Sequence, residues 1–110
     1  MDLELTIMNI INFSGDARSL SMEAISFAKN GDINKALKYL EDANSKLSEA
    51  HRSQTKLISE EANGVNKPIS LLLVHAQDHL MNAITIKDMA NEFVDLYKIL
   101  YDAKGVSISE

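Results

Sequence analysis

Several residue types are missing or rare in this 110-residue chain, and each absence removes a class of function. There is no cysteine, which excludes disulfides, thiolate metal sites and a cysteine nucleophile. The formal net charge is -5 and no Lys/Arg stripe interrupts it, so nucleic acid is a poor partner. The longest continuous apolar run, Leu71 to Val74, is far shorter than a membrane span.

A basic signal-peptide start is also lacking, because Asp2 and Glu4 occupy its place. We therefore expect a cytoplasmic protein without direct membrane insertion. Its 110 residues and its start at Met1 lead us to expect a complete protein of one domain. Aromatic residues make up only 5% of the chain. The core must then consist of Leu, Ile, Val, Ala and Met, which favours helices packed on helices over a sheet.

Glycine and proline are scarce too, and their positions divide the chain into three segments. Breaks fall at Gly31-Asp32, at 63–68 and at Lys104-Gly105. The sequence predicts an all-α, antiparallel three-helix bundle, with helices at about 3–29, 33–62 and 68–103. These form a single domain over 1–103, followed by a frayed tail at 104–110. Asp32 is a good N-cap for the second helix, and Pro68 suits the first turn of the third.

Apolar and small residues recur at helical spacing in the first two segments, and each set forms a seam for packing. The first seam is Ile7, Ile10, Ser14, Ala17, Ser21, Ala24 and Ala28, and the second is Ile33, Ala36, Leu40, Ala43, Leu47, Ala50 and Leu57, interrupted at Gln54. Small seam residues let a partner helix approach closely. We expect Gly15 to serve the same end, although glycine costs about 1 kcal/mol of helix propensity.

The third segment has apolar residues on every side of a helix. A helix that is apolar all round is buried all round. In a single three-helix bundle each helix keeps an outer face open to water. We therefore infer a homo-oligomer with the third helix at its centre.

Within this apolar segment lies the polar cluster His75, Asp78 and His79. At about 100° per residue, His75 and His79 lie about 40° apart and Asp78 about 60° to the other side of His75. Asn82 continues this face by one turn, whereas Gln77 points elsewhere. One interpretation is a buried polar network that fixes the register between subunits.

Two chemical interpretations compete with that structural one. Histidines at i and i+4 match zinc-protease spacing, but the required glutamate is replaced by Ala76, and a third ligand would have to be His51 or Asp78. Alternatively, one histidine is a nucleophile toward phosphorus, with His79 donating to the phosphoryl oxygens. Asp78 must then turn away from the phosphoryl group or be neutralised by a cation.

The stretch VHAQDHLMNAIT, preceded by SLLL and followed by EFVDLY, closely resembles the lactose/cellobiose-type enzyme IIA of the bacterial phosphoenolpyruvate-dependent sugar phosphotransferase system. The resemblance extends to GDARSLSMEAI (15–25), AKNGD (28–32) and EAHRSQTKLISEEANG (49–64). It covers roughly residues 5–101, and the HAQDHLM string shows no departure from the family pattern.

The resemblance implies a phosphoryl carrier. His75 would accept the phosphoryl group on its tele nitrogen from the histidine-containing phosphocarrier protein and pass it to a cysteine of enzyme IIB, during uptake of a β-linked disaccharide. His79 and Gln77 would line the phosphoryl site, with Gln77 reaching in from a neighbouring subunit. The family is a homotrimer, a nine-helix bundle, in which three copies of Asp78 share one divalent cation, usually Mg²⁺, on the threefold axis.

The resemblance agrees with the inference from the residues, because a trimer gives the third helix a central position. Three converging carboxylates would repel unless a cation or a proton offset them, and oxygen ligands favour magnesium or calcium. The rival hypothesis is a non-catalytic helical adaptor in which the His/Asp network only sets the oligomer register.

Overall fold

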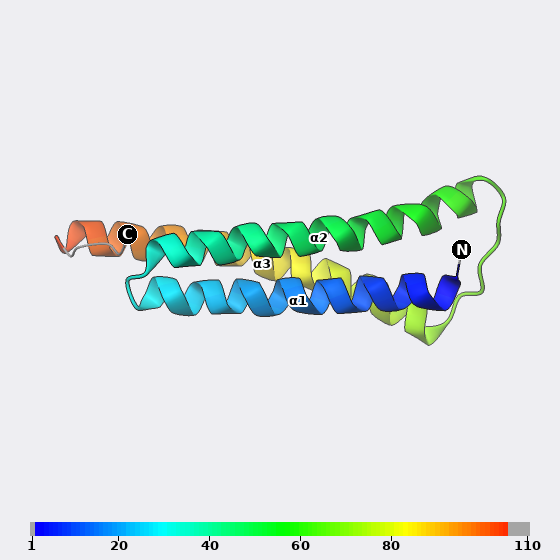
Figure 1. Cartoon of the computed structure of the whole chain (residues 1–110), viewed down its shortest axis with the longest axis horizontal. Coiled ribbons are helices and arrows are strands. Elements are labelled where there is room, and N and C mark those ends of the chain that lie inside the picture. The colour runs from blue at the N-terminus through cyan, green and yellow to red at the C-terminus, as the bar shows by residue number, and fades with distance from the viewer. Residues whose placement is uncertain (1, 106–110) are drawn as a thin grey trace.

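The computed structural model describes residues 2–105 as three long antiparallel helices (Figure 1). The helices are α1 (Leu3–Lys29), α2 (Ile33–Ala62) and α3 (Leu71–Ala103). They form a rod of 59 × 20 × 19 Å, and the described residues contain no strand. The all-α three-helix subunit is thus confirmed. Between residues 2 and 105, no helix is long and apolar enough to cross a membrane.

Side-chain caps begin all three helices. Asp32 accepts a hydrogen bond from the Lys35 backbone N–H at 3.2 Å, which confirms its predicted role as an N-cap. The third helix begins at Leu71, so the expectation that Pro68 lies in its first turn was wrong. Ser70 caps α3 instead: its backbone is extended, and its hydroxyl accepts from the Leu73 N–H at 3.1 Å.

The predicted seams form the core. Every residue of the α1 seam is buried, together with Thr6, and every residue of the α2 seam is buried, together with Ser53. From α3 the buried residues are Ala76, Leu80, Ala83, Ala90 and Val94. The core therefore has small side chains along much of its length, which lets the three helices pack closely.

Only one side of α3 is buried within the chain. This helix packs more extensively on α1 than on α2. Its opposite side exposes a row of large apolar side chains, which we call the apolar stripe of α3: Leu71, Val74, Met81, Met89, Phe93, Leu96, Ile99 and Leu100. Exposed apolar surface of this extent marks an interaction site.

The two ends of the bundle are joined differently. Near the α1–α2 turn, the Tyr101 hydroxyl donates to the Lys29 carbonyl, which ties the end of α3 to the end of α1. Gly31 stands in this turn with φ +87°, a backbone conformation that favours glycine. At the other end a longer connection leads from α2 to α3 (Figure 1). Of the expected frayed tail, residues 106–110 lie outside the described residues.

Candidate functional site

His75 lies in the second turn of α3, and its imidazole is exposed. The ring stacks on that of His79, one turn further on, with a centroid distance of 5.6 Å and an interplanar angle of 18°. A hollow of about 540 Å³ lies beside His75, with Leu71 and Leu72 as its other lining residues. The structure therefore brings the two histidines together and leaves one of them open to an incoming molecule.

His79 turns toward the neighbouring helix and is half-buried. A Cβ placed on Gly15 of α1 would lie 3.4 Å from the His79 Nε2. The sequence predicted that Gly15 allows close approach, and the group that approaches is this imidazole. Gly15 is thus part of the surroundings of the site. Its contact with His79 joins two helices, so residue spacing along the sequence could not predict it.

Gln77 lies on a different side of α3 from the histidines. Its Oε1 accepts a hydrogen bond from the Nε2 of Gln54 on α2 at 2.5 Å, and both side chains are half-buried. Gln54 interrupts the α2 seam, and that polar interruption was the one sequence signal for this contact. With its oxygen engaged by Gln54, the Gln77 amide keeps its N–H groups for another acceptor.

Asp78 is exposed within the apolar stripe of α3. Its Oδ2 accepts a hydrogen bond from the Asn82 Nδ2 at 3.4 Å. From residue 2 to residue 105, no three His, Cys, Asp or Glu side chains gather closely enough to hold a metal ion. One chain therefore offers a single carboxylate here, and a metal at Asp78 would need oxygen ligands from further copies.

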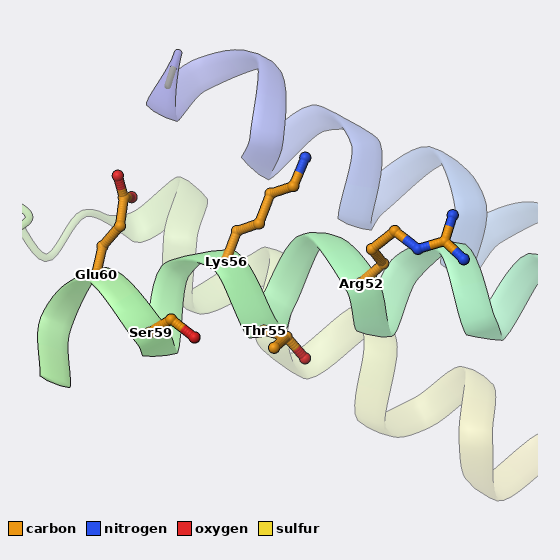
Figure 2. A pocket seen from close by; sticks show the side chains of 5 residues that line it. All are labelled: Arg52, Thr55, Lys56, Ser59 and Glu60. Carbon is orange, nitrogen blue, oxygen red and sulfur yellow. The ribbon is translucent and has the colours of Figure 1, made fainter. Parts of the chain in front are cut away.

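A larger hollow, of about 750 Å³, lies along α2 and is lined by Arg52, Thr55, Lys56, Ser59 and Glu60 (Figure 2). It contains no histidine. Arg52 is exposed, and its guanidinium donates to the Glu49 carboxylate at 2.9 Å. Lys67 lies 3.0 Å from a Glu60 oxygen and forms an ion pair with it. In both pairs the charged groups already interact with each other, which disfavours a phosphoryl site on this face. The smaller hollow beside His75 is therefore the better candidate.

The remaining histidine, His51, is exposed on α2 and takes no part in the pair formed by His75 and His79. The arrangement does not support the zinc alternative, because His51 does not join the other two within the described chain. What remains chemically is an open imidazole beside a second, more enclosed one.

The chain is similar to known proteins over most of its length. Residues 5–98 match the family described as "PTS system, Lactose/Cellobiose specific IIA subunit". Over 107 residues the chain is 50% identical to the lichenan-specific phosphotransferase enzyme IIA component of Bacillus subtilis (strain 168), a match that covers 97% of each chain.

Two solved structures share the fold. The crystal structure of the PTS cellobiose-specific enzyme IIA from Bacillus anthracis matches with a TM-score of 0.90 and 49% identity, over 93% of this chain and 94% of that one. A chain of the IIA(Chitobiose)–HPr complex of the N,N'-diacetylchitobiose branch of the Escherichia coli phosphotransferase system matches with a TM-score of 0.79 and 39% identity, over 91% and 97%. This chain therefore belongs to the lactose/cellobiose-specific IIA family of the sugar phosphotransferase system.

Proposed function

We propose that this protein is a cytoplasmic phosphoryl carrier that uses His75 as its transient phosphohistidine. The donor is the histidine phosphocarrier protein HPr, and the acceptor is a cysteine of the cognate enzyme IIB. The transported sugar is a β-linked disaccharide of the lactose, cellobiose or chitobiose class. The observation that carries this proposal is the exposed His75 imidazole, stacked on His79 beside an open hollow, in a chain of this family.

The chemistry needs no general base. The Nε2 lone pair of neutral His75 attacks phosphorus, a new N–P bond forms, and the N–P bond to the donor histidine breaks, returning its electron pair to that ring nitrogen. In the next step the IIB thiolate forms an S–P bond, the N–P bond to His75 breaks, and the electron pair of that bond returns to the His75 Nε2. An enzyme accelerates such transfers by positioning the groups and by stabilising charge on the phosphoryl oxygens. His79, one turn from His75, would donate a hydrogen bond to those oxygens.

The apolar stripe of α3 supports assembly as a homotrimer, a nine-helix bundle with α3 at its centre. Leu71 is 86% exposed and Ile99 63% in the single chain, and an oligomer would bury both. Gln77 follows His75 by two residues and so lies about 160° away from it around α3. The two flanks of α3 face different neighbours in a trimer, so Gln77 of one subunit would donate at the His75 site of the next.

Asp78 fits a place on the threefold axis, because it lies in the middle of the stripe that the trimer would bury. Three carboxylates there would form an all-oxygen site, which suits Mg²⁺. The ion would supply positive charge that offsets the repulsion among the carboxylates. Asn82 donates to the Asp78 carboxylate and would hold it in place.

Intact-mass measurement after incubation with phosphoenolpyruvate, enzyme I and HPr tests the proposal. Wild-type protein should gain one phosphoryl group per chain, labile to acid, and His75→Ala should gain none. His51→Ala is the matched control, since this exposed histidine on α2 lies outside the site, and it should be labelled like wild type.

The rival function is that of a non-catalytic helical adaptor. A folded wild-type trimer that stays unlabelled in the presence of active partners would support the adaptor. If His75→Ala gains as much phosphoryl mass as wild type, another side chain carries the phosphoryl group. That result would contradict the assignment of His75.

A further inference from the structure

Gly15 occupies an unusual position for a glycine. It lies in the middle of α1, where glycine is a weak helix former. The glycines with positive φ are Gly31, Gly64 and Gly105, so the backbone at position 15 needs no special conformation. The reason for a glycine here must therefore be space beside the helix.

The occupant of that space is the His79 ring. Its Nε2 lies 3.4 Å from the point where a Cβ on Gly15 would stand, which is van der Waals contact. A methyl group would just touch the ring, so side-chain atoms added beyond the Cβ on the side of α3 would require the imidazole to move. The same ring stacks on His75, with 18° between the planes. The packing against α1 thus limits where His79 can lie relative to His75.

We propose that Gly15 is a positioning residue of the phosphoryl site: the missing side chain at this position leaves the room in which His79 lies parallel to His75. The inference rests on the proposed function, because it gives His79 the task of donating to the phosphoryl group on His75. A displaced imidazole would lose that alignment, and misplacement by about 1 Å can cost up to about 100-fold in rate.

Substitution at position 15 tests the proposal, with the first readout taken from the unphosphorylated protein. The chain has three histidines, so a two-dimensional carbon–proton NMR spectrum gives three imidazole Cε1–Hε1 signals, assigned by single His→Ala variants. Gly15→Val should shift the signals of His79 and His75 and leave that of His51 in place. Ser19→Val, at an exposed position of α1, is the control for a β-branched residue in this helix and should shift none of them.

The second readout is the initial rate of phosphorylation by phospho-HPr, measured by intact mass. Gly15→Val should slow it about tenfold or more, toward the rate of His79→Ala. The double variant Gly15→Val/His79→Ala should be no slower than His79→Ala alone, because the valine then has no ring to displace. Ser19→Val should keep the wild-type rate.

Unmoved His75 and His79 signals in Gly15→Val would overturn the proposal, as would a double variant slower than His79→Ala. If Gly15→Val does not fold, thermal unfolding of Gly15→Val/His79→Ala decides. A cooperative transition in this double variant supports a clash between the valine and the His79 ring. A double variant that also fails to fold assigns Gly15 to backbone packing and overturns the inference. A wild-type protein that accepts no phosphoryl group would refute the proposed function, and with it the effect of Gly15 on the phosphorylation rate. The NMR spectra decide separately whether Gly15 sets the position of the His79 ring.

Discussion

Replacing Asp78 by leucine should stabilise the protein in metal-free buffer, although it removes a charged group from a polar cluster. Asp78 lies within the apolar stripe of α3, between Val74 and Met81, which are 54% and 60% exposed in the single chain. In the proposed trimer this surface faces the axis, and three carboxylates meet there. Asp78→Leu would remove their repulsion and extend the apolar contact.

The size of the effect follows from the apolar area gained. Burying a leucine side chain contributes about 1.5–3 kcal/mol. The unfolding entropy of a 110-residue chain is about 0.23 kcal/mol per degree, at about 2.1 cal/mol/K per residue. The midpoint of thermal unfolding should therefore rise by about 6–13 °C per substitution in each chain.

Differential scanning calorimetry and sedimentation velocity, both in EDTA, measure this change. Asp95→Leu is the matched control: Asp95 is exposed on α3 but lies about 100° around the helix from Asp78. It should leave the midpoint nearly unchanged. Adding MgCl₂ should raise the midpoint of the wild type but not that of Asp78→Leu, because a ligand stabilises only the state that binds it.

A lower midpoint for Asp78→Leu, or its dissociation into monomers in sedimentation, would refute the axial placement of this side chain. An equal rise of the midpoint with MgCl₂ in wild type and variant would refute the metal site. The trimer itself would be refuted only by the sedimentation result.

Three further changes test the fold, each by urea denaturation monitored by circular dichroism. Leu80→Ala should lower the free energy of unfolding by about 2–5 kcal/mol, because Leu80 is fully buried and the truncation leaves a cavity; a loss below 1 kcal/mol would contradict this packing. Ser70→Ala should lower the free energy of unfolding by about 1 kcal/mol, because the N-cap of α3 is lost. An unchanged free energy of unfolding would place the start of α3 at another residue. Tyr101→Phe should cost about 1 kcal/mol through loss of the bond to the Lys29 carbonyl, whereas the control Tyr97→Phe should cost less; equal losses would argue against that bond.

The helices and their buried faces could be predicted from the sequence. The seam from Ile7 to Ala28 and the seam from Ile33 to Leu57 are buried as the spacing of small and apolar residues indicated. Such spacing is a local property of one helix, so the buried face can be predicted without knowing which helices pack against it. The start of α3 was placed too early because Pro68 and Ser70 both suit a helix start, and only the backbone distinguishes them.

The site was only partly predictable. Histidines four residues apart on a helix must lie on one side of it, so the pairing of His75 with His79 followed from spacing alone. The contact of His79 with Gly15 and that of Gln77 with Gln54 did not, because each joins residues of different helices. Such contacts depend on how two helices are rotated and shifted against each other.

By itself, the sequence determined that this protein is a three-helix subunit with an apolar third helix that carries a histidine pair and a carboxylate. These features follow from periodicity, which links residues three or four apart on one helix. The tertiary structure alone decided which helix each polar side chain meets, how His79 lies against α1, and which side of α3 stays uncovered. Those choices depend on side-chain volumes from all three helices packing together, and no single segment encodes them.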